Sequence, residues 1–301
     1  MKLKIGKHIL NISKEDKILF KKNITKLDII NYYNNISSLM LKYIKNRPLM
    51  MLRYPNGIDG KSFVQKNASV YFPNWIKTVK VPLKNDSVKK YTNYVICNNK
   101  ETLIYLANQA VLEYHIWLSN INRLNYPDKI VFDLDPGTED FEPIKICALM
   151  LKEMLESFNL KPFLMTTGSK GLHIVVPIKQ SENLDKLLDF EKVKNFADQC
   201  AQKIINLKPE LFTQYIRKDK RGKRLFIDTL RNQYGATSIA PYSTRARFNC
   251  PIATPLYWHE IHEKGMYSGK YNIKNIAKRL GNMEDPWLNF TSSARILKLN
   301  N

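Results

Sequence analysis

The sequence has few cysteines, and no two of them lie at metal-binding spacing. It contains Cys97, Cys147, Cys200 and Cys250, which are about fifty residues apart and form no C-x-x-C pair. Structural zinc sites need such close pairs, so a zinc finger or zinc ribbon is excluded. We therefore expect four buried, reduced thiols.

Long apolar runs are also missing. No window reaches the roughly eighteen apolar residues that a membrane-spanning helix needs. The first ten residues, MKLKIGKHIL, lack an apolar stretch followed by a small-residue cleavage site, which argues against a secretory signal there. The sequence thus predicts a cytoplasmic protein with no membrane partner.

Acidic residues are scarce relative to basic ones. The 301 residues include 48 Lys and Arg against 27 Asp and Glu, a net charge of +21. A chain with this charge repels itself and attracts polyanions, so nucleic acid is the partner we expect. An AT-rich genome would account for part of the lysine excess but less readily for the arginines. A hydrophobic content of 44% is enough for a real core and argues against disorder.

No Pro/Ser-rich linker, internal repeat or low-complexity tract interrupts the chain, so any second module must pack closely on the first. Apolar residues recur every three to four positions over residues 25–45, which predicts an amphipathic helix with Thr25 as its cap. A variable loop, VPLKNDSVKKY at 81–91, precedes a strand near 95. We also expect strands at 49–53, 114–119, 129–135, 163–167, 172–178 and 225–228, and helices at about 142–157, 186–205 and 272–280.

Two aspartates end one of the predicted strands, KIVFDLD at 129–135. Successive side chains of a strand alternate, so Asp133 and Asp135 share one face about 6 to 7 Å apart. Carboxylates placed in this way can hold one or two hard divalent cations. A strand-end turn with solvated acids remains the alternative interpretation of this pair taken alone.

The same stretch also resembles the haloacid-dehalogenase phosphatases, in which D-x-D-G-T follows the first strand. Here Pro136 interrupts that motif, and the motif lies far from the N-terminus. The phosphatases usually need a later Gly-Asp loop, and no Gly-Asp dipeptide occurs in this sequence. The phosphatase interpretation is therefore weak.

A glycine-bracketed turn, TTGSKGLHIVVPI at 166–178, joins two further strands. Its backbone N–H groups, beside Lys170, can bind phosphate oxygens. His173 points to the same face as Gly171, which suits a side chain reaching a surface site. An ordinary hairpin with a buried histidine is the alternative.

Another strand, LFID, ends in a third carboxylate, Asp228, and is followed by Arg231, Arg245 and Arg247. Carboxylates that hold metal ions, together with guanidinium groups and Lys170 that hold a triphosphate, fit one chemistry. Any single arginine among these is explained as well by a salt bridge.

In this order, FDLDPG, SKGLHIVVP and FIDTLRN…ATSIAPYSTRAR resemble the polymerase domain of bacterial DNA ligase D, in the archaeo-eukaryotic primase superfamily. The likeness extends upstream through RPLMMLRYPNGIDGKSFVQK and downstream through NIAKRLGNMEDPW, so it covers nearly the whole chain. It implies an α+β fold, a primase-like catalytic core of mixed and antiparallel sheets flanked by helices, with a closely packed N-terminal α/β module. Residues 1–301 would form one polymerase domain, with 1–110 binding the DNA end and template and 111–301 as the core.

The resemblance also implies roles for particular residues. It implies two divalent ions, Mn²⁺ or Mg²⁺, on Asp133, Asp135 and Asp228, with NTP or dNTP as substrates. The implied nucleotide-binding residues are His115, Thr167, Ser169, Lys170, His173, Arg231, Arg245 and Arg247. The implied DNA-binding residues are Lys14, Lys17, Lys26, Arg53, Phe63 and Lys66. Among these, Lys17 and Lys26 would grip a 5′-phosphate, and Phe63 would stack on template bases.

Some positions depart from the family pattern. Val64 replaces a second aromatic, Thr167 a usual serine, Leu52 a basic residue and Lys14 a usual Asn. We expect Val64 to weaken template stacking, and Leu52 and Lys14 to alter the grip on the DNA end. The hydroxyl of Thr167 can still serve in place of the serine. Gly57 stands where a ligase would carry its adenylated lysine, so we expect no nick sealing from these residues.

The function implied is template-directed filling or extension of broken DNA ends in bacterial non-homologous end joining, with a preference for ribonucleotides. The expected partners are DNA with a double-strand break, gap or 5′-phosphate, a Ku-type end-binding protein and a separate ligase, in a nucleoid-associated complex. A primase that starts chains de novo is one alternative. A catalytically idle protein that bridges DNA ends is another.

Overall fold

The structure is a computed structural model that describes residues 1–83 and 90–299. The chain divides into two units, and neither is continuous in the sequence. Unit 1 comprises Met1–Trp117, Ile239–Ile252 and Asn272–Ala277, and unit 2 comprises Leu118–Ser238, Ala253–Tyr271 and Lys278–Asn301. The expected division at residue 110 into a DNA-binding module and a catalytic core stays a prediction.

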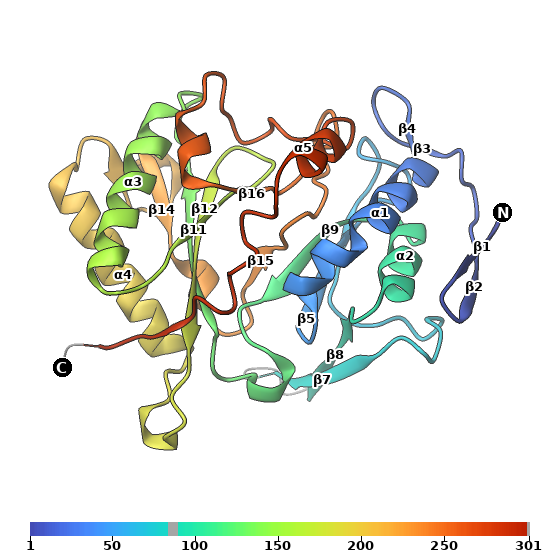
Figure 1. The fold of residues 1–301 in the computed structure, drawn as a ribbon, viewed down its shortest axis with the longest axis horizontal. Helices are drawn as coiled ribbons and strands as arrows, with labels where there is room; N and C mark the ends of the chain where they lie inside the picture. Colours follow the sequence, from blue (N-terminus) through green and yellow to red (C-terminus); the bar gives the residue numbers. More distant parts are fainter. Residues whose placement is uncertain (84–89, 300–301) are drawn as a thin grey trace. The chain divides into compact units, whose positions relative to one another are not determined.

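Two helices of unit 1 lie side by side, α1 (Lys26–Ile44) and α2 (Lys100–Asn108) (Figure 1). Helix α1 confirms the amphipathic helix expected at 25–45. Thr25 caps it in a capping box, in which Thr25 and Asp28 satisfy each other's backbone N–H groups. Helix α2, capped by Asn99, was not predicted, because nine residues are too few to show a clear helical period.

The main sheet of unit 1 contains the strands predicted at 49–53, near 95 and at 114–119. Its order is β9-β5-β8-β7, with β6 paired to β5. Residues 84–89 of the predicted loop at 81–91 lie outside the described residues. The strands are β5 (Pro48–Arg53), β6 (Phe63–Gln65), β7 (Thr78–Pro82), β8 (Tyr91–Ile96) and β9 (Val111–Trp117). Two hairpins precede them, β1 (Lys2–Ile5) with β2 (His8–Asn11) and β3 (Ile18–Phe20) with β4 (Ile24–Thr25).

The sheet of unit 2 is built around β10 (Lys129–Asp135), whose bounds are those expected from the sequence. Its order is β13-β14-β10-β12-β11-β16, and β10 is antiparallel to both of its neighbours. The other strands are β11 (Phe163–Thr166), β12 (Leu172–Lys179), β13 (Phe212–Thr213), β14 (Leu225–Asp228), β16 (Pro255–Leu256) and β17 (Arg295–Ile296), the last parallel to β12. A short strand, β15 (Thr237–Ile239), spans the point where the chain passes back to unit 1.

Helices α3 (Glu142–Ser157) and α4 (Phe190–Leu207) pack against each other and against β10 (Figure 1). Helix α3 has the predicted bounds. Helix α4 begins about four residues later than predicted, because Asp189 caps it and accepts a hydrogen bond from the Lys192 N–H. The predicted C-terminal helix is α5 (Ile276–Asn282). Short 3-10 helices are η1 (Ile121–Arg123), η2 (Leu184–Lys186), η3 (Lys218–Lys220), η4 (Leu230–Asn232) and η5 (Trp258–His262).

The four cysteines are buried and free, which confirms the expectation of reduced thiols. Across the described residues, no helix combines the length and apolar character needed to cross a membrane. The mixed antiparallel sheets and flanking helices confirm the predicted α+β class.

Candidate active site

Three neighbouring strands of unit 2 bring Asp133, His173 and Asp228 together. Asp133 of β10 lies directly opposite His173 of β12 on one side and Asp228 of β14 on the other. The Asp133 Oδ1 atom is 3.4 Å from His173 Nε2. Residues directly opposite in an antiparallel pair are close neighbours on one face of a sheet. The strand register therefore gathers three of the predicted site residues from distant parts of the sequence.

Arg231 bridges the two carboxylates. Its Nε atom donates to Asp133 Oδ2 at 3.2 Å and lies 3.9 Å from Asp228 Oδ2. The next residue, Asn232, is fully buried and bonds both the N–H and the C=O of Val131 on β10, at 2.9 and 2.7 Å. Asn232 thus fixes η4 to the strand that carries Asp133. Sequence reasoning missed this anchoring role, because a single Asn has no motif around it.

The two carboxylates differ in acidity. Burial by itself raises the pKa of Asp133, but the charges of His173 and Arg231 outweigh it and lower this pKa to about 2. The pKa of Asp228 is raised, first by burial and further by the negative charge of Asp133, although a hydrogen bond from the Leu230 N–H opposes the rise. Two acids that repel each other in this way favour a cation bound between them.

Asp135 lies on the same face of β10 as Asp133, but its carboxylate pairs with a different arginine, Arg221. Its Oδ2 atom accepts a hydrogen bond from Arg221 Nη1 at 3.0 Å, and the Arg221 guanidinium lies 3.8 Å from the centre of the Phe226 ring. Sequence reasoning missed Arg221, because nothing distinguishes it within the basic segment RKDKRGKR.

Within residues 1–83 and 90–299, no group of three or more His, Cys, Asp or Glu side chains is arranged to hold a metal ion. The donor chemistry nevertheless fits a hard divalent cation, because Asp133 and Asp228 face each other and offer only carboxylate oxygens. The buried Nδ1 atom of His173 also has no hydrogen-bond partner in the described part of the chain. Arg231 supplies positive charge beside Asp133 and Asp228, and Arg221 supplies it beside Asp135.

The turn at 167–171 is held rigidly against β10. The hydroxyl groups of Thr167 and Ser268 both donate to the Gly171 carbonyl, at 3.0 and 2.7 Å. A Cβ at Gly171 would lie 1.8 Å from the Leu134 carbonyl oxygen, so only glycine permits this approach to β10. The predicted Thr167 therefore shapes the turn, and Ser268, which was not predicted, assists it.

Two other predicted residues, Ser169 and Lys170, lie at the exposed side of this turn. The Ser169 N–H donates a hydrogen bond to the Thr167 hydroxyl at 3.3 Å. Lys170 is exposed and makes no ion pair with the residues that the structure describes. Its ammonium group is therefore available to an anion.

In unit 1, the buried Glu113 of β9 contacts two predicted nucleotide-binding residues, His115 and Arg245. Its carboxylate lies 3.1 Å from His115 Nε2 and 3.2 Å from Arg245 Nε, and it accepts from the Ala246 N–H at 2.9 Å. Burial raises the pKa of Glu113, but His115 and Arg245 outweigh it and lower this pKa to about 2. Glu113 was not predicted, although its position two residues before His115 puts both on one strand face. Arg247 is exposed nearby in the sequence.

Three predicted lysines of unit 1 gather at the start of α1. Lys26 is buried at the first helical position and donates to the Ser13 hydroxyl at 3.3 Å. Its pKa is lowered by burial and by the charges of Lys17 and Lys14, against an opposing effect of Glu15. Cations that repel one another at a helix N-terminus favour a bound anion.

The remaining predicted residues lie around β5 and β6. Arg53 of β5 is directly opposite Phe63 of β6, and its guanidinium is 5.2 Å from the centre of the Phe63 ring. Lys66 follows β6 and is exposed. The predicted site residues thus fall into groups within each unit.

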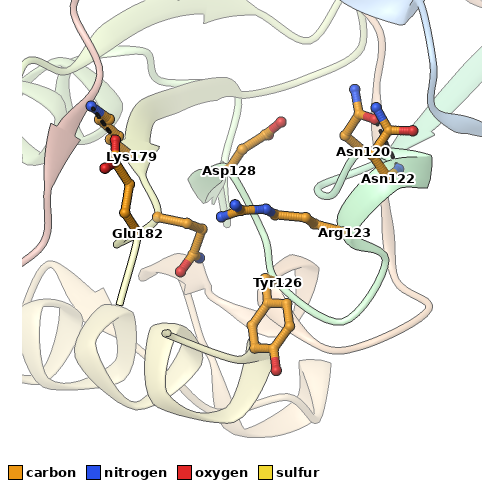
Figure 2. A pocket seen from close by; sticks show the side chains of 8 residues that line it. Asn120, Asn122, Arg123, Tyr126, Asp128, Lys179 and Glu182 are labelled. Carbon is orange, nitrogen blue, oxygen red and sulfur yellow. Dashed lines mark hydrogen bonds and ion pairs between the residues drawn. The ribbon is translucent and has the colours of Figure 1, made fainter. Parts of the chain in front are cut away.

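A pocket of about 370 Å³ lies elsewhere in unit 2 and contains none of the predicted residues (Figure 2). Asp128 lines it just before β10, so the pocket lies at the end of the strand opposite to Asp135. Both signs of charge line it, and Lys179 and Glu182 form an ion pair at 4.0 Å. We assign it no role. Its lining residues are Asn120, Asn122, Arg123, Tyr126, Asp128, Lys179, Gln180 and Glu182.

Known proteins resemble this chain in sequence over most of its length. Residues 25–287 match the family model described as LigD, primase-polymerase domain. The chain is 31% identical over 283 residues to the bifunctional non-homologous end joining protein LigD of Bacillus subtilis, covering 93% of this chain and 44% of that protein. It is 30% identical over 257 residues to the multifunctional LigD of Mycolicibacterium smegmatis, covering 84% of this chain and 32% of that protein. The chain therefore spans less than half the length of these relatives.

A solved structure extends the likeness to the fold. The polymerase domain of Mycobacterium tuberculosis ligase D, in complex with DNA, superposes with a TM-score of 0.85 at 27% identity. The match covers 95% of this chain and 99% of that one. Because the family model matches most of the sequence and the fold agrees, the chain belongs to the LigD primase-polymerase domain family, a family of nucleotidyltransferases.

Proposed function

We propose that this chain adds nucleotides to broken or gapped DNA ends, directed by the opposing template strand, during bacterial non-homologous end joining. The observation that carries the proposal is the register that places Asp133 between His173 and Asp228. It supports a site where acids from separate strands act on one phosphate group. We further propose a preference for ribonucleotides, as the resemblance implies.

Within this site, Asp133, Asp135 and Asp228 would hold two divalent ions, Mn²⁺ or Mg²⁺. When bound, such ions would neutralise phosphate charge and favour in-line attack of a primer 3′-hydroxyl on the α-phosphate, with the bond to the β-phosphate breaking and pyrophosphate leaving. Arg231 already neutralises the acid pair, at 3.2 Å from Asp133, and can turn to a phosphate oxygen when cations replace it.

The chain's own cations and turns would hold the nucleotide. Lys170 and the backbone of the 167–171 turn suit the triphosphate, because that turn is fixed against β10. We assign His115, Arg245 and Arg247 to nucleotide binding as well. Glu113 fixes the orientation of His115 and Arg245 through its hydrogen bond and ion pair with them.

The partners that we propose are DNA with a double-strand break, gap or 5′-phosphate, a Ku-type end-binding protein and a separate ligase. The M. tuberculosis structure contains DNA, and the names of the relatives state end joining, which supports DNA as a partner. The net charge of +21 supports it independently. Binding to broken chromosomal DNA would place the protein at the bacterial nucleoid.

Primer extension on a gapped duplex tests the proposed function. We expect addition directed by the template base, with NTP used more efficiently than dNTP, when Mn²⁺ or Mg²⁺ is supplied. Synthesis on a bare template without primer would favour the primase alternative. If neither metal supports any addition, the polymerase proposal is wrong and the DNA-bridging alternative gains support.

Lys17 and Lys26 supply a second test. We expect the double variant Lys17→Ala, Lys26→Ala to lose its preference for a 5′-phosphorylated gap, because it removes two of the three cations that gather at the α1 N-terminus. Charged hydrogen bonds contribute about 1.5 to 3 kcal/mol, so the preference lost is about tenfold or more. Fluorescence anisotropy with phosphorylated and unphosphorylated gaps measures it.

Lys2→Ala with Lys4→Ala is the matched control for this test. It removes the same formal charge from the exposed lysines of β1. We expect it to weaken binding to both gaps equally. An equal loss on both gaps by the Lys17/Lys26 variant would show that these lysines add only general charge.

A further inference from the structure

Tyr71 is an exposed aromatic residue that shares an arginine with Phe63. Tyr71 is 58% exposed and Phe63 is 46% exposed. Arg53 Nη1 donates to the Tyr71 hydroxyl at 2.8 Å, and the same guanidinium lies 5.2 Å from the centre of the Phe63 ring. One fixed cation therefore holds both aromatic side chains at the surface of unit 1.

The guanidinium itself is rigidly placed. Arg53 is only 8% exposed and also donates to the Gln65 side chain at 2.9 Å and to the Gln109 carbonyl at 2.9 Å. These contacts use several of the five N–H donors of an arginine in its planar geometry. The hydrogen bonds of the buried Arg53 therefore help to position the rings of Tyr71 and Phe63.

The loop that carries Tyr71 is fixed as well. The Gln65 amide donates to the Asn67 carbonyl at 2.9 Å and to the Ser69 hydroxyl at 2.8 Å. Behind Tyr71, the ring of Phe72 packs edge-on at 5.2 Å between centroids. An aromatic side chain that is held so firmly and left exposed is ready to receive a flat ligand without losing conformational entropy.

The surroundings indicate which ligand this is. Val64, at the position where an aromatic was expected, is 55% exposed and has no ring to stack on a base. Lys61 and Lys66 are exposed on either side of β6, so the aromatic surface is bordered by positive charge. Exposed aromatics beside cations suit unpaired nucleic acid, because every base offers a π-face and every nucleotide a phosphate.

We propose that Tyr71, held by Arg53, is a stacking platform for an unpaired base of single-stranded DNA beside Phe63. It supplies the ring that Val64 lacks. This inference rests on the proposed function, since the single strand is the unpaired template or overhang of a broken end.

Binding without catalysis tests the inference. We would measure fluorescence anisotropy of a duplex with a short single-stranded overhang and of the same duplex with a blunt end, in the absence of nucleotides. Because an exposed aromatic ring stabilises an unpaired base by stacking, we expect Tyr71→Ala to bind the overhang about tenfold more weakly. Blunt-end binding should not change, and Tyr71→Trp, which keeps an aromatic ring, should bind the overhang within about twofold of the wild type.

Tyr91→Ala is the matched control. Tyr91 is also an exposed tyrosine of unit 1, at 47%, with Lys80 Nζ 4.7 Å from its ring centre. We expect it to leave both affinities unchanged. A 2-aminopurine base in the overhang should be quenched by the wild type and by Tyr71→Trp, and less by Tyr71→Ala.

Several outcomes would overturn the inference. Wild-type affinity of Tyr71→Ala for the overhang, or an equal loss on overhang and blunt DNA, would show that Tyr71 does not stack on a base. If the wild type binds both DNAs but Tyr71→Ala changes nothing, the proposed function survives and this inference fails. Failure of the wild type to bind either DNA would overturn both.

Discussion

Replacing Asp133 and Asp135 with asparagine is expected to reduce nucleotide addition at least about a thousandfold, equivalent to about 4 kcal/mol of transition-state stabilisation. Asparagine keeps the size of each side chain but removes the negative charge that a divalent cation needs. We expect the Asp133 substitution to cause the larger part of this loss of activity, because Asp133 lies opposite Asp228 and interacts with both His173 and Arg231. Primer extension on a gapped duplex, with saturating metal, measures the loss.

DNA binding by the same double variant separates catalysis from affinity. We expect binding to be kept or slightly strengthened, because affinity comes mainly from neutralising phosphates and the substitutions remove acids. Asp140→Asn is the matched control, since Asp140 follows the same strand but is exposed, and its carboxylate accepts a hydrogen bond from the Glu142 N–H. Unchanged extension by the double variant would refute the catalytic assignment.

Replacing Glu260 with alanine should lower the free energy of unfolding by about 3 to 5 kcal/mol, the cost of leaving a buried charge without its partner. Glu260 is fully buried and forms a bidentate pair with Arg279. It also accepts from the Tyr257 N–H at 2.7 Å and from the Tyr271 hydroxyl at 3.1 Å. Removal of the carboxylate therefore leaves the buried positive charge of Arg279 without its counter-charge. Arg279 keeps its hydrogen bonds to the Tyr271 hydroxyl and the Pro255 carbonyl, but these acceptors carry no negative charge. Urea denaturation followed by circular dichroism measures the change.

Two further variants show whether the unpaired charge is the cause. Replacing both Glu260 and Arg279 with methionine should recover much of the loss, since no buried charge then remains. Glu263→Ala breaks a partly exposed ion pair with Lys270 in the same region, and should cost less than about 1 kcal/mol. If Glu260→Ala were no more destabilising than Glu263→Ala, the buried pair would not stabilise the fold.

Local rules determined much of the secondary structure from the sequence. The bounds of β10 and α3 were predicted correctly, because their signals are local in the sequence. These signals are an apolar run, a Pro-Gly turn and a helical period. The capping box of Thr25 is equally local. The alternation of a strand placed Asp133 and Asp135 on one face before any tertiary contact was known. The ordered motifs also indicated the family.

The pairing between strands was decided only by the tertiary structure. That Asp228 lies opposite Asp133 depends on the register of β10 with β14, which pairs residues far apart in the chain. Residues 239–252 return to unit 1, and this brings Arg245 to Glu113. Such contacts depend on how whole elements pack, so no short window contains them.

The partners of the charged side chains show the same limit. The sequence identified the acids and the arginines as types suited to metals and phosphates, but it did not reveal that Arg221 pairs with Asp135 or that Arg53 holds Tyr71 beside Phe63. The sequence alone determined the chemistry available and the elements that carry it. Tertiary structure decided which charges meet, because electrostatic and hydrogen-bond energies depend on distances of a few ångströms that only packing sets.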